Sequence, residues 1–167
     1  MPRITAKLEE LDALERRFSL LASEATTIAK RSLYDGAAVA ADSLRVSVNG
    51  LSRVSDAEAI QAHRTGTPTI LSVSQKNGLR KGLGISPMKV KGKAISVKVG
   101  FDGYNSVKTK RWPDGQPNQM VAASCEHGST AMVEQPFIRP TFESHRASIL
   151  RAMIRTATKE IDRILET

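Results

Sequence analysis

The chain has 167 residues, of which 40% are hydrophobic and only 4% aromatic, and it carries a formal net charge of +8. This length favours a single domain spanning 1–167, with a core built mainly of aliphatic and alanine side chains. The one cysteine excludes an intrachain disulfide, no apolar run approaches the ~20 residues that cross a bilayer, and the charged N-terminus lacks the apolar centre of a signal peptide. We therefore expect a protein that is used without secretion and away from membranes.

Residues 1–48 are expected to be helical. Apolar residues recur at helical spacing from Ile4 to Leu33, with charged residues on the opposite face. Gly36 is expected to kink or end this helix, and the alanine-rich residues after it to resume the helix to about Val48. A helix over 5–34 would be ~45 Å long, against a radius of gyration of about 15 Å for a compact domain of this size. The helix is thus predicted to overhang its domain and to need a neighbour. The alternative is a break near Ser19–Ser23 that folds it back.

Residues 49–78 are rich in glycine, serine and proline and are expected to form a mobile connection. The one short helix predicted within it is Asp56–His63. A pair of strands follows, at Gly82–Val90 and Ala94–Phe101, because the second of them alternates apolar and polar residues at the period of a half-buried strand. The sheet is expected to cover 79–124, interrupted by a polar loop over 102–118.

The chain from Met120 to Pro140 is expected to connect this sheet to a last helix. Met120–Ala123 is interpreted as a short strand, and Glu126–Ser129 as a turn in which Gly128 adopts a backbone conformation that other residues avoid. Pro140 suits the first turn of an amphipathic helix within 136–167. The order of elements predicts an α+β fold: a long N-terminal helix, a small antiparallel sheet of three to four strands with a basic hairpin and a long loop, and a C-terminal amphipathic helix.

Few residues suggest a catalytic or metal-binding role. If Met120–Ala123 begins a strand, Cys125 and His127 share one side of it, and a thiol–imidazole pair is geometrically conceivable. No residue is placed to orient that imidazole, so a small buried thiol and a histidine at the rim is the favoured interpretation. The three histidines belong to different elements, which argues against a metal site. Gly82-x-Gly84 is not followed by the helix that a phosphate-binding loop requires, which argues against a phosphate site. The sequence predicts no catalytic residue, no cofactor and no metal.

The charge is unevenly distributed. Between Lys76 and Arg111 there are ten cations and one anion, which gives this segment +9 and leaves −1 for the rest of the chain. A basic hairpin and loop can bind phosphates or an acidic protein surface, and lysines can equally protect a sheet edge from aggregation. Aromatic residues for stacking bases are nearly absent here. The candidate partner-contact residues are Lys89, Lys91, Lys93, Lys108, Lys110, Arg111 and Trp112.

Three motifs in this order resemble a known family. Thr65-Gly66 or Asn77-Gly78-Leu79 precedes the hairpin, and the hairpin ends in Val97-Lys98-Val99-Gly100. The most specific motif is a Glu-x-Gly-Ser turn followed by Pro-Phe-Ile-x-Pro, whose residues are Glu126, Gly128, Ser129, Pro136, Phe137 and Pro140. Over roughly residues 60–165 the chain resembles the tail-completion, or head-to-tail joining, proteins of long-tailed bacteriophages and prophages.

The resemblance implies a non-enzymatic virion protein. Such proteins form a ring, here expected to contain six copies, at the head-proximal end of the tail, and connect it to the neck of the DNA-filled head. The implied partners are other copies of the chain and neighbouring neck, tail-tube or tail-terminator proteins, with at most incidental contact with viral DNA. The implied location is the neck and tail of the virion, after assembly in the host bacterial cytoplasm. The alternative from another class is a basic α+β nucleic-acid-binding module, and a third is a small hydrolase built on Cys125.

Overall fold

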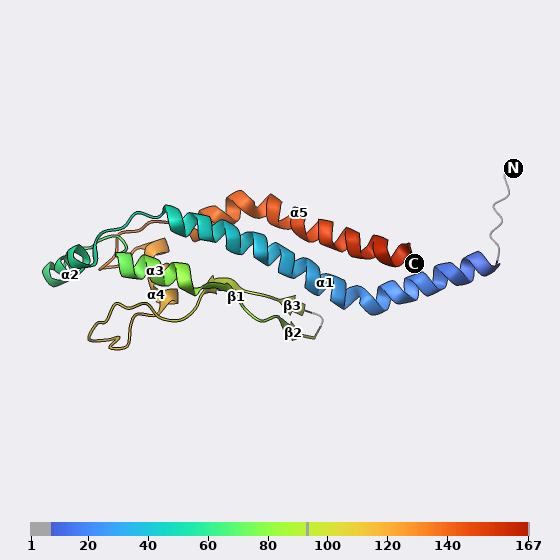
Figure 1. Ribbon diagram of the computed structural model, residues 1–167, viewed down its shortest axis with the longest axis horizontal. Coiled ribbons are helices and arrows are strands. Elements are labelled where there is room, and N and C mark those ends of the chain that lie inside the picture. Colours follow the sequence, from blue (N-terminus) through green and yellow to red (C-terminus); the bar gives the residue numbers. More distant parts are fainter. Residues whose placement is uncertain (1–7, 93, 167) are drawn as a thin grey trace.

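The computed structural model describes residues 8–92 and 94–166 (Figure 1). The described residues form five helices and four short strands: α1 (Leu8–Gly50), α2 (Asp56–Thr65), α3 (Val73–Gly82), β1 (Leu83–Ile85), β2 (Lys89–Lys91), β3 (Ala94–Ser96), β4 (Val99–Phe101), α4 (Asn118–His127) and α5 (Ile138–Leu165). The α+β class expected from the sequence is confirmed. The molecule is elongated, with α1 and α5 side by side and the smaller elements along the other side of α1 (Figure 1).

Helix α1 is one unbroken helix of 43 residues, about 65 Å long at the usual rise per residue. It runs through Ser19–Ser23 without folding back, so the alternative of a broken helix is wrong. The helix end expected as one possibility at Gly36 is wrong too, because α1 continues to Gly50. A Cβ at Gly36 would lie 2.6 Å from Cγ of Met153 in α5, so this glycine allows two helices to approach closely.

Helix α5 lies antiparallel along the C-terminal part of α1. Near the start of α5, the hydroxyls of Ser47 and Thr141 are 2.6 Å apart. Near its end, the Arg31 guanidinium pairs with the Glu160 carboxylate at 2.6 Å. The N-terminal part of α1 therefore continues beyond the C-terminal end of α5, as Figure 1 shows.

The four strands form one hairpin ribbon, divided into two sheets of two antiparallel strands. Leu83 is paired with Phe101 in the β1–β4 sheet, and Lys89 with Ser96 in the β2–β3 sheet. Between the sheets, three residues (Ser86–Met88) oppose two (Val97 and Lys98), which shifts the register by one residue. Because Pro87 has no N–H for a ladder hydrogen bond, this is where the pairing is interrupted.

Helix α3 was not predicted. The boundary expected at residue 79, between a connection and a sheet, falls inside this helix. A capping box starts α3: the Ser72 hydroxyl accepts from Gln75 N at 3.2 Å, and the Gln75 side chain accepts from Ser72 N at 2.9 Å. Its glycines are sites of close approach, since a Cβ at Gly82 would lie 2.2 Å from the carbonyl oxygen of Asp102. The short helix predicted at Asp56–His63 is confirmed as α2.

The strand predicted at Met120–Ala123 is wrong, because these residues lie in helix α4. Val121, Ala122 and Cys125 are buried, which is the spacing of one helix face. A short apolar run does not by itself distinguish a strand from a buried helix.

The core lies where the C-terminal half of α1 meets α3, α4 and the start of α5. Its packing is aliphatic with one aromatic pair, since the rings of Phe101 and Phe137 meet edge to face at 5.8 Å. The buried residues of this core are Leu44, Val48, Leu71, Leu79, Leu83, Val121, Ala122, Cys125, Met132 and Phe137.

Candidate functional site

The Glu-x-Gly-Ser motif forms a structural joint between α4 and α5. The Glu126 carboxylate accepts hydrogen bonds from the backbone N–H groups of Phe137 (2.7 Å), Ile138 (2.7 Å) and Arg139 (2.9 Å). These are donors of the first turn of α5, and the residue at its N-cap, Phe137, supplies no side-chain cap. A carboxylate from α4 therefore caps α5 from outside the helix, where the helix dipole also favours negative charge.

The environment of Glu126 favours its charged form. Its burial alone would raise the pKa, but the three backbone N–H groups of Arg139, Ile138 and Phe137 together lower the pKa below the ordinary value. The side chain is 7% exposed. The residue is therefore a buried, satisfied anion that serves the fold.

The other motif residues support the same joint. Gly128 has φ +73°, in the region that favours glycine, so the expectation for Gly128 is confirmed. The turn expected over Glu126–Ser129 is shorter than that, because Glu126 and His127 are still in α4. The Ser129 hydroxyl accepts from Ala131 N at 3.3 Å within the turn. Phe137 is buried in the core, Pro136 is exposed, and Pro140 lies in the first turn of α5 as expected.

The thiol–imidazole pair is not formed. Because α4 is a helix, Cys125 and His127 do not face each other. Cys125 is fully buried, and its desolvation, followed by the charge of Glu126, raises its pKa to about 11. His127 is exposed. The interpretation of a small buried thiol is confirmed, and among the described residues no cluster of His, Cys, Asp or Glu is suited to a metal.

The candidate partner-contact residues do not form one surface. Lys89 and Lys91 are exposed on β2, and Lys93 lies outside the described residues. Lys108, Lys110 and Arg111 are exposed on the loop before α4. That loop lies beside α2, far along the molecule from the β2–β3 tip (Figure 1). A cavity of about 640 Å³ between this loop and α2 is lined by the apolar Ile60 and Met120 among others.

Trp112 belongs to the loop group and is half-buried there. The guanidinium of Arg111 lies 5.5 Å from the centre of its ring, a cation–π contact within the same loop. The backbones of Thr109 and Trp112 exchange hydrogen bonds at 3.0 Å in both directions. These contacts, all within one loop, fix the position of the Trp112 side chain.

Three of the ten cations between Lys76 and Arg111 lie on α3. The sequence interpretation, in which this positive charge belongs to the hairpin and the loop, is therefore wrong for these three. Lys76 is buried, and its ammonium donates to the carbonyl oxygens of Asn49 (2.8 Å) and Leu51 (2.6 Å) at the C-terminal end of α1. Desolvation and then the charges of Arg53 and Arg80 lower its pKa. This cap was missed because a lysine in a basic segment gives no sequence signal of burial.

Several exposed large apolar residues lie on the two long helices. In the overhanging part of α1, Phe18 is 59% exposed, and Leu14 and Leu20 are exposed as well. On α5, Ile154 is 64% exposed and belongs to a stripe at spacings of four and seven residues. We call Leu14, Phe18 and Leu21 the arm stripe. The α5 stripe consists of Leu150, Ile154, Ile161 and Leu165.

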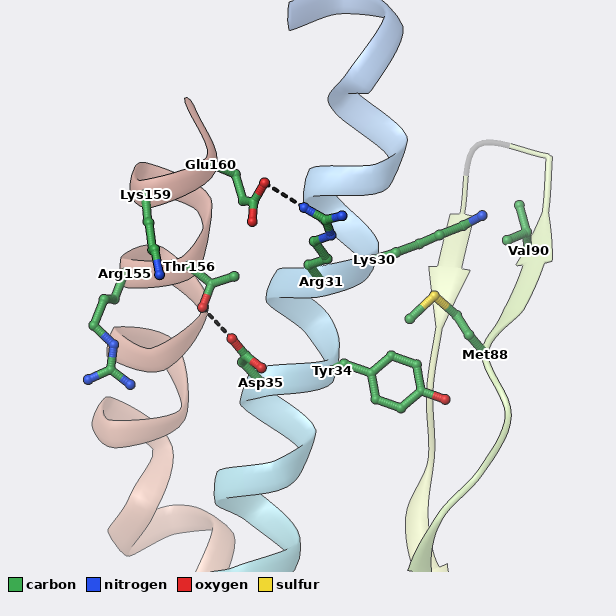
Figure 2. A pocket seen from close by; sticks show the side chains of 10 residues that line it. All are labelled: Lys30, Arg31, Tyr34, Asp35, Met88, Val90, Arg155, Thr156, Lys159 and Glu160. Atoms are coloured by element: carbon green, nitrogen blue, oxygen red, sulfur yellow. Dashed lines mark hydrogen bonds and ion pairs between the residues drawn. The ribbon is translucent and has the colours of Figure 1, made fainter. Parts of the chain in front are cut away.

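A cavity of about 770 Å³ lies where α1, α5 and the hairpin tip meet. Figure 2 shows Arg31 and Asp35 pointing from α1 toward α5, and Lys30 and Tyr34 pointing toward the hairpin. Arg31 pairs with Glu160, and the Thr156 hydroxyl donates to the Asp35 carboxylate. These contacts join α1 to α5, so these four polar groups help to hold the fold.

The comparisons with known proteins identify no relative. No protein-family model matches the chain, and neither a curated protein nor a solved structure shows significant similarity to it. Within residues 8–92 and 94–166, no helix has both the length and the hydrophobicity to span a membrane.

Proposed function

We propose that this chain is a non-enzymatic structural subunit of a long-tailed phage or prophage, forming a ring of several copies, expected to be six, at the head-proximal end of the tail. The ring joins the tail to the neck of the head. Neighbouring neck and tail proteins contact its two ends. The subunit is assembled in the host cytoplasm and retained in the virion.

The observation that carries this proposal is the uncovered apolar surface of α1 and α5. A monomeric soluble protein seldom exposes large contiguous apolar patches, and such patches typically mark protein interfaces. Here Phe18 and Ile154 are each more than half exposed, on helices that run most of the length of the molecule (Figure 1). A subunit whose neighbours cover these stripes in the particle accounts for both.

The joint at Glu126 supports the same proposal. The motif that resembles tail-completion proteins fixes the direction in which α5 leaves the core, through three backbone hydrogen bonds to one carboxylate. In a ring, the angle between the core and a long helix decides where that helix meets the next copy. A motif with this structural role suits an assembly subunit.

The proposal is tested by deleting the gene from its phage or prophage and examining the lysate by electron microscopy. The expected result is filled heads and free tails that remain unjoined, with joining restored by a plasmid copy of the wild-type gene. Complete, infectious particles without this chain would overturn the proposal.

A nucleic-acid-binding module remains the second candidate, because Lys108, Lys110 and Arg111 are all exposed in one loop. Binding of this kind weakens steeply as salt rises. The two proposals are separated by measuring the affinity for duplex DNA across a salt series, with Lys89, Lys91 and Lys93 neutralised in one variant and Lys108, Lys110 and Arg111 in another. Tight, salt-sensitive binding that is lost in either variant would favour the DNA-binding candidate.

A further inference from the structure

Among the residues that the structure describes, none covers the overhanging part of α1 between Asp12 and Leu20. All residues from Asp12 to Leu20 are exposed. The segment continues past the C-terminal end of α5 (Figure 1). To reach the α5 stripe of its own chain, α1 would have to break and reverse, although it is one continuous helix from Leu8 to Gly50. The α5 stripe of the same chain therefore does not cover the arm stripe.

The overhanging segment of α1 and the α5 stripe are similar in length. The overhanging residues Leu8–Glu24 span about 25 Å, and the α5 stripe from Leu150 to Leu165 spans about the same, at ~1.5 Å per residue. Leu14, Phe18 and Leu21 follow the alternating spacing of four and three residues with which helices pack along a shared seam. The arm stripe itself, from Leu14 to Leu21, spans about 10 Å, so it can cover roughly half of the α5 stripe.

Their charges are complementary. Leu8–Glu24 contains five acidic residues (Glu9, Glu10, Asp12, Glu15 and Glu24) and two basic ones, a net charge of −3. Helix α5 contains six basic residues (Arg139, Arg146, Arg151, Arg155, Lys159 and Arg163) and three acidic ones, a net charge of +3. We call the overhanging segment Leu8–Glu24 the arm. Pairing two arms or two α5 helices would bring like charges together, which is costly at an interface. An arm on an α5 helix brings opposite charges together.

From the uncovered apolar residues on both helices and from their opposite charges we infer that the arm of one copy, Leu8–Glu24, packs along the α5 stripe of a second copy. The contact is head-to-tail, because each copy offers the arm at one place and the α5 stripe at another. Repeated contacts of this type form a ring if the rotation closes, and a filament if it does not. The inference rests on the proposed function for the closed ring, while the contact itself is a property of the purified chain.

Charge reversal on both sides tests this contact. The first variant carries Asp12→Arg and Glu15→Arg on the arm, the second carries Arg151→Glu and Arg155→Glu on α5, and the third carries all four changes. All four side chains are exposed, and circular dichroism of each variant checks that its fold is retained. Self-association is measured by sedimentation equilibrium up to about 1 mM chain, which detects contacts as weak as millimolar.

The expected result is self-association of the wild type, weakened about tenfold or more in each one-sided variant and largely restored in the four-fold variant. A mixture of the two one-sided variants is expected to associate with the two variants alternating, because each arm then meets an α5 helix of opposite charge on the other variant. A matched control, Asp114→Arg with Arg64→Glu, reverses two exposed charges at the end of the molecule that holds α2 and is expected to leave association unchanged.

The inference is overturned by a wild type that stays monomeric to about 1 mM, by one-sided variants that associate like the wild type, or by a four-fold variant that does not recover. These outcomes concern the contact alone. The proposed function fails separately, if particles assemble normally without the chain.

Discussion

At the scale of single residues, the charged groups that are buried serve helix ends. The Glu126 carboxylate caps the start of α5, and the Lys76 ammonium caps the end of α1. Both were visible in the sequence only as ordinary charges: Glu126 as part of a turn motif, and Lys76 as part of a basic segment. The sequence does not reveal that these two side chains are buried, because their burial arises from the packing of α3 and α4 against α1.

We predict that Glu126→Gln destabilises the protein by about 1–3 kcal/mol at pH 7, because an ionised acceptor of three buried hydrogen bonds is replaced by a neutral one. The pKa of Glu126 is lowered from 4.5 in the folded state. The stabilisation is therefore complete above the pKa of the unfolded glutamate and disappears as the pH falls through the lower folded pKa.

Urea unfolding of the wild type and the variant at pH 7 and at successively lower pH measures this difference. The gap between the two proteins is expected to close in acid. The exposed Glu134→Gln serves as the matched control, with little expected effect. Equal stabilities of wild type and Glu126→Gln at pH 7 would contradict the role of the cap.

We predict that Cys125 does not react with thiol reagents in the folded protein. The side chain is fully buried and its pKa is raised to about 11 from 9.0, so the reactive thiolate is scarce and inaccessible. At pH 7 and at pH 9, alkylation of the native chain is expected to be far slower than that of a free cysteine peptide. Labelling is followed by mass spectrometry, with the urea-unfolded chain as positive control, and rapid labelling of the native chain would refute the prediction.

At the scale of elements, the long amphipathic helices could be read from the sequence and the short ones could not. The apolar repeat over 4–33 and the stripe after Pro140 extend over many turns, so their periodicity is unambiguous. Helix α4 has only ten residues, and its apolar run satisfies a strand equally well. Helix α3 was concealed by Gly78 and Gly82, which usually signal a break.

The glycines of this fold explain that failure. A Cβ at Gly78 would lie 2.4 Å from Cβ of Asn105, and one at Gly36 would meet Met153. In both cases a second element, distant in sequence, occupies the space of the missing side chain. Local propensity predicts a break at such a glycine, while tertiary packing requires the glycine inside a helix.

We predict that Gly36→Leu destabilises the protein by about 1–3 kcal/mol, because the added side chain has no room between α1 and α5. Ala38→Leu, on the exposed side of the same helix, is the matched control and is expected to change the stability little. Met153→Ala is expected to relieve part of the cost in a double variant. Thermal unfolding of the wild type, the two single variants at positions 36 and 38 and the double variant measures these differences. Equal effects of Gly36→Leu and Ala38→Leu would contradict the packing of α1 against α5.

We predict that removing residues 1–20 changes the free energy of unfolding by less than about 1 kcal/mol, because the side chains from Asp12 to Leu20 are exposed. The same truncation is expected to abolish self-association. Urea unfolding and sedimentation of the truncated chain measure the two effects separately. A large loss of stability would show that the arm contributes to the fold of its own chain.

At the scale of the whole molecule, the sequence predicted the class of fold and the overhang of the first helix, but not which surface is available to partners. The cations that looked like one basic face divide between α3, the hairpin tip and a distant loop, and Lys76 is buried. The α5 stripe was not anticipated, because an apolar residue on a helix is normally assigned to the core. Only the placement of α1 shows that α5 has a second, uncovered apolar face.

The central claim is that other copies of this chain cover its arm and its α5 stripe in an assembled particle. A cryo-electron microscopy reconstruction of the neck region of purified particles, from a strain that encodes this chain, tests it most directly. The account predicts a closed ring of this chain between head and tail, with Phe18 of each copy packed on α5 of the next. Particles that lack the chain, or that hold it with both stripes open to solvent, would contradict the account.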